Sequence, residues 1–168
     1  MGWANWLREQ ERRMLFALNG KYRSPLLDRA MRLLTHIGGA SFSSILLLLL
    51  VAIYHFPWNG LIALVASHLL IQVLKRSFRR HRPYLLESSI HFTAKPLKDA
   101  SFPSGHTTAV FAACVSIALV VPGLAPLLLI IACLVGWSRI YLGLHYPADV
   151  IVGALIGGLT AVIVHMIV

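Results

Sequence analysis

Charged residues are scarce in this chain. Lys, Arg, Asp and Glu make up 12% of its 168 residues, whereas hydrophobic residues make up 58%. Because soluble domains carry about a quarter charged residues, this deficit excludes an ordinary soluble domain and indicates an integral membrane protein. The apolar runs are continuous rather than alternating, which favours helices over a β-barrel. We therefore expect an all-α fold, a polytopic bundle of membrane helices.

Acidic residues are the scarcest charged group, with six Asp and Glu against 15 Lys and Arg, which gives a formal net charge of +9. A positive balance of this kind suits anionic lipid headgroups or an anionic substrate. Nucleic acid is the other common partner of basic proteins. The sequence contains no basic, aromatic-bearing soluble domain to hold it, so we expect no nucleic-acid binding.

Cysteine is also rare, and no spacing of residues is typical of metal ligands. Cys114 and Cys133 both lie inside apolar runs, where a thiol behaves as a small hydrophobic group, so we expect no disulfide. The N-terminal stretch "MGWANWLREQERRMLF" lacks the apolar core of a signal peptide, so we expect no cleaved signal.

The first 40 residues are predicted to form an amphipathic segment. In residues 3–18, tryptophans such as Trp3 and Trp6 alternate with arginines, a pattern typical of a helix in the lipid headgroup layer. A helix that covers the ends of other helices explains the pattern equally well. Residues 25–37 are predicted to form a second, partly polar helix, after which Gly38 and Gly39 allow a bend.

Residues 41–168 are predicted to form the transmembrane core of a single domain spanning 1–168. Its apolar runs are close to the ~20 residues that cross a bilayer, so we expect about five crossings. The expected spans are 41–57, 60–75, 105–121, 125–141 and 148–168. Residues 76–102 are predicted to form the one long loop, and a long loop in a small domain usually has a functional role. Gly153 and Gly157 are expected to serve helix packing.

A first polar cluster, "KRSFRRHRP", covers residues 75–83. Lys75, Arg79 and Arg82 are spaced by four and three, which predicts one face of a helix that ends near Pro83. Three cations on one face repel one another unless an anion lies among them. The cluster therefore indicates either an anion site or a solvated, basic helix end.

A second cluster, "PSGH", stands at the start of the third predicted span. Ser104 and Gly105 open that helix, and a helix start attracts anions through its free N–H groups and its dipole. His106 then supplies a titratable group beside the anion. The alternative is that Ser104 only caps the helix and His106 is a loop residue. Nearby Asp99 either tunes His106 or is merely a solvated loop residue, and we favour the loop residue.

A third cluster, "SRIYLGLHYPADV", covers residues 138–150. Arg139 ends the fourth predicted span, and His145 and Asp149 flank the start of the fifth, with Pro147 in its first turn. A carboxylate at this spacing can orient an imidazole, and ionisable residues in membrane helices mark functional sites. Counting crossings places the three clusters on the same side of the membrane, which predicts a phosphate pocket containing a nucleophile.

Together the three motifs K-x6-R-P, P-S-G-H and S-R-x5-H-x3-D, over residues 75–149, resemble the signature of the type-2 phosphatidic acid phosphatase superfamily. This superfamily includes bacterial lipid phosphate and diphosphate phosphatases and shares its site with vanadium haloperoxidases. The resemblance implies a metal-independent phosphatase without cofactors. It also implies that five residues bind the phosphoryl group: Lys75, Arg82, Ser104, Gly105 and Arg139.

The same resemblance implies the catalytic roles. His145 is expected to attack phosphorus and become a phosphohistidine, Asp149 to orient His145, and His106 to protonate the leaving group and then activate water. Some basic residues of the first cluster match no fixed motif position and are expected to contact headgroups or to be solvated. These are Arg76, Arg79, Arg80 and His81. The remaining histidines are expected to be interfacial or packed: His36, His55, His68, His91 and His165.

The motifs leave the substrate open. Small bacterial relatives resemble undecaprenyl diphosphate phosphatases, which we favour, or phosphatidylglycerophosphate phosphatases. A non-catalytic lipid-phosphate binder or transporter is the alternative of another class, and its pocket would not need the His145–Asp149 pair. A vanadate-dependent haloperoxidase is disfavoured because those relatives are soluble.

The side of the membrane is open as well. Family resemblance favours the outer face of the plasma membrane. However, all but one of the 15 Lys and Arg lie before residue 33 or between residues 75 and 98, on the same side by our count, and the positive-inside rule predicts that this side is cytoplasmic.

Overall fold

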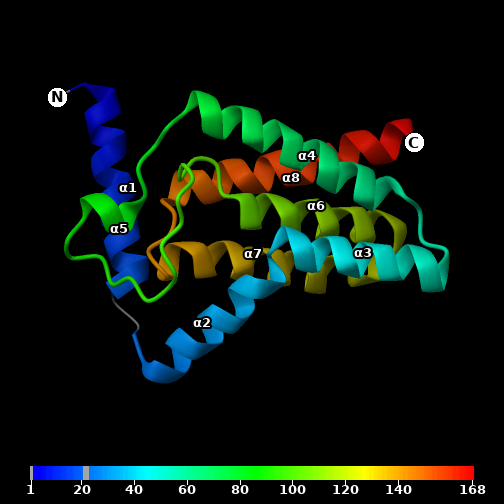
Figure 1. The fold of residues 1–168 in the computed structure, drawn as a ribbon, viewed down its shortest axis with the longest axis horizontal. Helices are drawn as coiled ribbons and strands as arrows, with labels where there is room; N and C mark the ends of the chain where they lie inside the picture. Colours follow the sequence, from blue (N-terminus) through cyan, green and yellow to red (C-terminus); the bar gives the residue numbers. More distant parts are fainter. Residues whose placement is uncertain (1, 21–22) are drawn as a thin grey trace.

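The computed structural model describes residues 2–20 and 23–168, and the described part of the chain is helical, without strands. The elements are α1 (Trp3–Gly20), α2 (Pro25–Ile37), α3 (Ala40–Tyr54), α4 (Asn59–Ser77), α5 (Pro83–Leu86), α6 (Gly105–Val120), the 3-10 helix η1 (Pro122–Leu124), α7 (Ala125–Tyr141) and α8 (Pro147–Ile167). The long helices α3, α4, α6, α7 and α8 run side by side, while α1 lies across one end of the bundle (Figure 1). The predicted all-α fold is confirmed.

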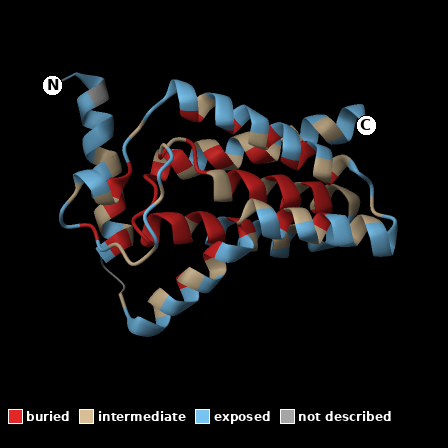
Figure 2. Cartoon of the chain, in the orientation of Figure 1, coloured by how far each residue is buried: buried red, intermediate tan, exposed pale blue. Residues whose placement is uncertain are grey.

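Helix α6 forms the centre of the bundle and packs against α3, α4, α7 and α8. Small residues such as Ala109, Ala112 and Ala113 are buried along it, which lets the surrounding helices approach closely. Figure 2 shows this burial as a nearly continuous run of buried residues along α6. The PSGH motif stands at the start of this central helix, so its polar groups lie where several helices meet.

Two glycines bring α8 against α6. A Cβ atom added to Gly153 would lie 2.7 Å from the carbonyl oxygen of Ser104, and one added to Gly157 would overlap the backbone of α6. Only glycine tolerates this proximity, which supports the predicted packing role. The close approach also lets the Ser104 amide donate a hydrogen bond to the carbonyl of Asp149 at 3.0 Å, which joins the second and third motifs.

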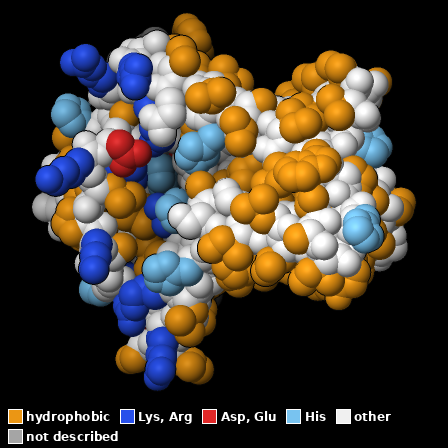
Figure 3. All heavy atoms as spheres, turned by 45° about the vertical axis from the view of Figure 1, so that its right-hand side comes forward, with side chains coloured by type: hydrophobic (Ala, Val, Ile, Leu, Met, Phe, Trp, Pro, Cys, Tyr) orange, Lys and Arg blue, Asp and Glu red, His pale blue; other side chains and the backbone are white. Residues whose placement is uncertain are grey.

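The number of membrane crossings stays a prediction. Three segments of the described chain are long and apolar enough to cross a bilayer: Asn59–Ser77, Pro122–Tyr141 and Pro147–Ile167. Helices α2 and α3, bent by 54° at Gly38 and Gly39, add a fourth if they are taken as one span, and α6 is apolar but shorter. On the face in Figure 3, Lys and Arg gather at one end, and hydrophobic side chains cover much of the rest.

Helix α1 packs over the ends of α7 and α8. Leu15 and Asn19 are buried, and the Asn19 amide donates hydrogen bonds to the carbonyls of Tyr141 at 2.8 Å and His91 at 3.0 Å. Trp3 and Trp6 remain 78% and 57% exposed on the other side of the helix. The structure therefore supports a covering role for α1, and its position in the headgroup layer stays a prediction.

The structure corrects one local prediction. Helix α4 ends at Ser77, so Arg79 and Arg82 do not continue its face, and Pro83 begins α5 instead of ending α4. The physical reason is that a residue before proline favours extended backbone, which Arg82 adopts with φ −78° and ψ 151°, while proline suits the first position of a helix. A loop, and not a helix, therefore carries Arg82 to the site.

Candidate active site

The segment between α7 and α8 positions His145. Gly143 adopts a positive φ of 71°, a left-handed conformation that favours glycine. The chain then folds back, so that the amides of Leu144 and His145 both donate to the carbonyl of Arg139, at 3.1 Å and 3.2 Å. The His145 side chain is consequently buried at the end of α7, pointing away from solvent.

A cavity of about 190 Å³, here called the central cavity, lies beside His145. Its lining contains every residue predicted for the site except Ser104 and Asp149: Lys75, Arg82, Gly105, His106, Arg139 and His145. These residues belong to α4, α6, α7 and two loops. The predicted convergence of the three sequence clusters is therefore present in the fold.

Asp99 contacts two of the cations in this cavity. Its carboxylate accepts hydrogen bonds from Nζ of Lys75 at 2.8 Å and from Arg82 at 2.7 Å. Burial alone raises the pKa of the Asp99 carboxyl, but the two cations outweigh it and lower that pKa to about 2. The prediction of a merely solvated loop residue was wrong, because spacing along the chain does not reveal that loop 87–104 returns to α4.

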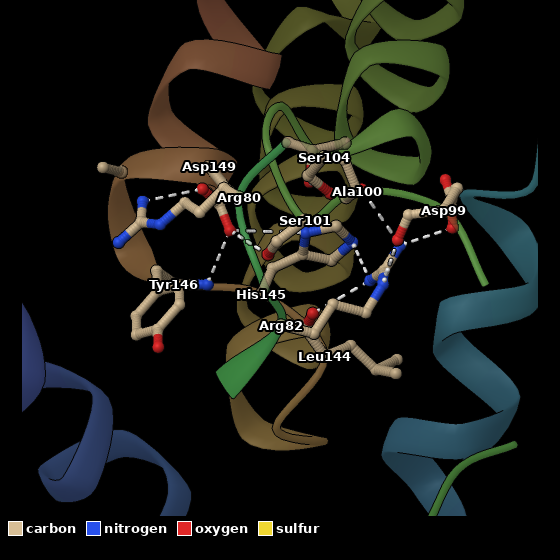
Figure 4. A network of polar contacts seen from close by, with 12 residues as sticks. Arg80, Arg82, Asp99, Ala100, Ser101, Ser104, Leu144, His145, Tyr146 and Asp149 are labelled. Carbon is tan, nitrogen blue, oxygen red and sulfur yellow. Dashed lines mark hydrogen bonds and ion pairs between the residues drawn. The ribbon is translucent and has the colours of Figure 1, made fainter. Parts of the chain in front are cut away.

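Arg82 also contacts His145, the candidate nucleophile. One guanidinium nitrogen donates to the carbonyl of Leu144 at 2.9 Å and lies 3.1 Å from Nε2 of His145 (Figure 4). Burial lowers the pKa of the His145 imidazole to about 3, and the charges of Arg139 and Arg82 add to this effect, against the opposing influence of Asp149. His145 is therefore a neutral imidazole at neutral pH.

Asp149 lies behind His145, with Oδ2 3.6 Å from Nδ1 of the ring. The carboxylate is fully buried and is held by other donors: Oδ2 accepts from the Ser101 hydroxyl at 2.5 Å and from the Tyr146 amide at 2.9 Å, and Oδ1 accepts from Arg80 at 2.9 Å (Figure 4). Reasoning from the sequence missed Ser101 and Arg80, since neither lies at a fixed motif position.

Arg80 connects Asp149 to helix α1. Its guanidinium donates to both carboxylate oxygens of Glu11, at 2.5 Å and 3.3 Å, and lies over the Tyr146 ring, 3.9 Å from its centre. Glu11 also accepts a hydrogen bond from the Ala148 amide, in the first turn of α8, at 3.1 Å. The expectation of a solvated or headgroup-binding Arg80 was therefore wrong.

The remaining predicted residues differ in their access to the cavity. Ser104 is fully buried, its hydroxyl accepts a hydrogen bond from Thr107 at 2.9 Å, and it makes no side-chain cap to α6. Arg139 donates to the Thr35 hydroxyl of α2 at 2.5 Å. His106 faces the α2–α3 bend, where a Cβ atom on Gly39 would lie 3.9 Å from its Nε2.

An apolar groove of about 280 Å³ adjoins the central cavity, and its lining is dominated by Leu64, Val65 and Leu69 of α4. It shares Ala40, His68 and Gln72 with the central cavity. His68 was expected to be an ordinary packed or interfacial histidine, and the structure places it at the junction of the two spaces. Only the relative placement of α3 and α4 reveals this junction.

Comparison with known proteins agrees with the motifs. The family model of the PAP2 superfamily matches residues 56–168. The chain is 37% identical over 107 residues to the lipid A 1-phosphatase of Rhizobium etli, which covers 59% of this chain and 46% of that protein. It is 35% identical over 158 residues to phosphatidylglycerophosphatase B of Bacillus subtilis, covering 80% of this chain and 72% of the relative.

The structural comparison extends over nearly the whole chain. The crystal structure of a transmembrane PAP2-type phosphatidylglycerolphosphate phosphatase from Bacillus subtilis superimposes with a TM-score of 0.85 at 28% identity, covering 97% of this chain and 86% of that one. The chain therefore belongs to the PAP2 superfamily. It spans about half the length of the Rhizobium relative, and the relatives' names indicate different lipids.

Proposed function

We propose that this member of the PAP2 superfamily hydrolyses a phosphate monoester or diphosphate of a membrane lipid through a phosphohistidine at His145. The observation that carries the proposal is that one cavity is lined by the cations Lys75, Arg82 and Arg139 together with His106 and His145, and that Asp149 lies behind His145. Phosphoryl transfer depends mainly on positioning and on cations around the equatorial oxygens, and this cavity offers both.

In the first step, Nε2 of neutral His145 attacks phosphorus and the bond from phosphorus to the leaving oxygen breaks. His106, which lines the same cavity, donates a proton to that oxygen. The phosphorylated imidazole is positively charged, and its Nδ1–H faces the Asp149 carboxylate. Lys75, Arg82 and Arg139 balance the charge on the phosphoryl oxygens, and the Gly105 amide at the start of α6 adds a donor.

In the second step, His106 takes a proton from water, the water oxygen attacks phosphorus, and the P–N bond breaks to release phosphate and neutral His145. Splitting one displacement into two is the usual advantage of covalent catalysis. Apart from Asp149, which lies behind His145, each step uses only groups that line the cavity, and the cations are side chains of the chain itself. Ser104 is proposed to act by fixing the start of α6, since it is buried outside the cavity lining and its hydroxyl accepts a hydrogen bond from Thr107.

The apolar groove supports a lipid substrate. It opens from the central cavity along α4, where Val65 and Leu69 are 58% and 65% exposed. An acyl or prenyl chain can lie there while its phosphate enters the central cavity. We favour undecaprenyl diphosphate as the substrate, with phosphatidylglycerophosphate as the alternative.

The test is phosphate release by the purified protein in detergent with EDTA present, from undecaprenyl diphosphate, phosphatidylglycerophosphate and phosphatidic acid. We expect release by the wild type, none by His145→Ala, and no loss in His91→Ala, which removes an exposed histidine. With a substrate whose leaving group departs without a proton, such as a p-nitrophenyl phosphate ester, acid-labile phosphate should accumulate on His106→Ala, because only the second step then lacks its proton-transfer group. Tight lipid binding without release, unchanged in His145→Ala, would instead establish a binder.

The role of the groove is tested separately. Leu69→Trp fills the groove, whereas Leu70→Trp changes an exposed neighbour on α4 outside its lining. We expect Leu69→Trp alone to lower kcat/KM for a long-chain substrate about tenfold, while a short, water-soluble phosphate ester is hydrolysed as before. Equal effects of both variants would contradict this route for the lipid chain.

We propose that the site faces the outer side of the plasma membrane, on family resemblance, although the basic residues favour the opposite orientation. A Cys133→Ser, Ser89→Cys chain would carry an exposed thiol in the loop on the side of the site, with Cys114 buried. Labelling of intact cells by a membrane-impermeant thiol reagent supports the outer face. Labelling only in inverted membrane vesicles would place the site on the cytoplasmic side of the membrane.

A further inference from the structure

A second and larger cavity, of about 430 Å³, adjoins the central cavity and is here called the basic cavity. The two share the side chains of Lys75, Arg82 and Asp99, so they meet at the cations that face Asp99. His106, Arg139 and His145 line the central cavity only. The basic cavity is therefore connected to the proposed reaction centre but lies outside it.

The charge of the basic cavity is strongly unbalanced. Its lining holds six Lys and Arg side chains and one carboxylate, that of Asp99. Asp99 is already engaged by Lys75 and Arg82, and Arg80 is engaged by Glu11 and Asp149. Among the residues that the structure describes, this leaves three cations of the lining without an ion pair: Arg76, Arg79 and Lys98.

These three cations are not needed for the first phosphate. Lys75, Arg82 and Arg139 already surround the central cavity, and none of Arg76, Arg79 and Lys98 lines it. A concave surface of one charge concentrates the electrostatic potential and attracts anions more strongly than a flat basic surface does. Like charges held close together are also mutually repulsive, and an anion between them relieves the repulsion.

The order of the spaces along α4 indicates where the second anion lies. Val65 and Leu69 line the apolar groove, Gln72 lines all three spaces, and Arg76 lines the basic cavity. These residues are spaced by four, three and four, so they share one face of the helix. The groove and the basic cavity thus lie on opposite sides of the central cavity, one apolar and one cationic.

We propose that the basic cavity, through Arg76, Arg79 and Lys98, is a second oxyanion site that takes one phosphate group. The link between this site and turnover rests on the proposed function. The phosphate group that occupies the site can come from two sources. One is a second phosphate of the substrate headgroup, as in a lipid diphosphate. The other is inorganic phosphate on its way from the central cavity to water.

The first experiment measures the site without turnover. Calorimetric titration of His145→Ala with inorganic phosphate should show two phosphates per chain. The same chain with Arg76→Gln, Arg79→Gln and Lys98→Gln should bind one. A charge-matched control with Arg8→Gln, Arg13→Gln and Arg29→Gln, all exposed residues outside the basic cavity, should still bind two. One phosphate in every chain, or equal loss in both triple variants, would overturn the proposal.

The second experiment identifies the source, with His145 intact. If the second anion belongs to the substrate, the triple variant should lower kcat/KM about tenfold for a prenyl diphosphate and less than twofold for the prenyl monophosphate of the same chain length. If the second anion is released phosphate, the triple variant should change kcat/KM by the same factor for both substrates, and inorganic phosphate should inhibit it about tenfold more weakly than it inhibits the wild type. Behaviour identical to the control triple in both assays would overturn the proposal.

The two proposals fail in different ways. A chain that binds two phosphates but releases none from any lipid would refute the phosphatase mechanism and leave the second site standing. A chain that hydrolyses lipid phosphates, yet binds one phosphate and is unaffected by the triple substitution beyond its control, would refute the second site alone.

Discussion

The carboxylate of Asp149 is held by the guanidinium of Arg80 at 2.9 Å, while Nδ1 of His145 lies 3.6 Å from the other carboxylate oxygen. Arg80 in turn pairs with Glu11 of α1. The residue proposed to orient the nucleophile is therefore itself oriented by a helix from the other end of the chain. Hydrogen bonds to a buried carboxylate from a cation are among the stronger ones, so this contact restricts where Asp149 can move.

Arg80 is accordingly expected to be a positioning residue. Arg80→Gln should lower kcat about tenfold, equivalent to about 1.4 kcal/mol, with little change in KM, because Asp149 loses its Oδ1 partner while the cavity cations stay in place. Arg80→Lys should recover part of the rate. Steady-state kinetics on one lipid substrate tests this, with Arg13→Gln as the surface control. A pure rise in KM would show that Arg80 binds substrate instead.

Asp99 is expected to compete with phosphate for Lys75 and Arg82, since it pairs with both. Asp99→Asn should strengthen inhibition by inorganic phosphate by about tenfold, because a negative charge beside the anion is removed. The inhibition constant at pH 7 is the measurement. Weaker inhibition in Asp99→Asn would mean that Asp99 organises the two cations for phosphate instead of competing with it.

We expect the stability of the protein to depend on pH through the titration of His145. Its pKa is lowered from 6.5 to about 3 in the folded chain. Above pH 6.5 the His145 imidazole is neutral in both the folded and the unfolded state, so it adds no pH dependence to the free energy of unfolding. As the pH falls from 6.5 toward 3, His145 becomes protonated in the unfolded state but stays neutral in the folded state, so the free energy of unfolding falls. Thermal unfolding in detergent across this range should show less loss in His145→Gln. An identical slope would contradict a neutral, buried His145.

The activity profile gives a second check on the same group. Because His145 is neutral well below pH 6, the rate should have no acid limb near pH 6.5 caused by protonation of the nucleophile. The rate of phosphoenzyme formation, measured by rapid quench, isolates this step. A limb near pH 6.5 in that rate would show that His145 keeps an ordinary imidazole pKa.

The packing of α8 on α6 should be sensitive to a single methyl group. Gly157→Ala would overlap the backbone of α6, so we expect it to lower the free energy of unfolding by about 1–3 kcal/mol and to reduce activity, because Asp149 lies on the same helix. Gly158→Ala is the matched control, since its Cβ would lie 3.9 Å from Val115. Equal stability of the two variants would contradict the close approach of these helices.

The sequence by itself determined the helical class, most helix bounds and the motif residues. Long apolar runs can be satisfied in lipid only by helices, and PSGH, Arg139 and His145 stand at predictable ends of those helices. That is why the helices over 25–37, 105–120 and 125–141 fall where the sequence predicted them, within one residue.

Only the tertiary structure decided which loop residues reach the site. Asp99 pairs with Lys75 and Arg82, Ser101 and Arg80 hold Asp149, and Glu11 joins the network from α1. None of these contacts follows from spacing along the chain, because each depends on how a loop returns over the helix ends. Helix periodicity is a local property, whereas the pairing of charges across 69 residues, as between Arg80 and Glu11, is set by packing.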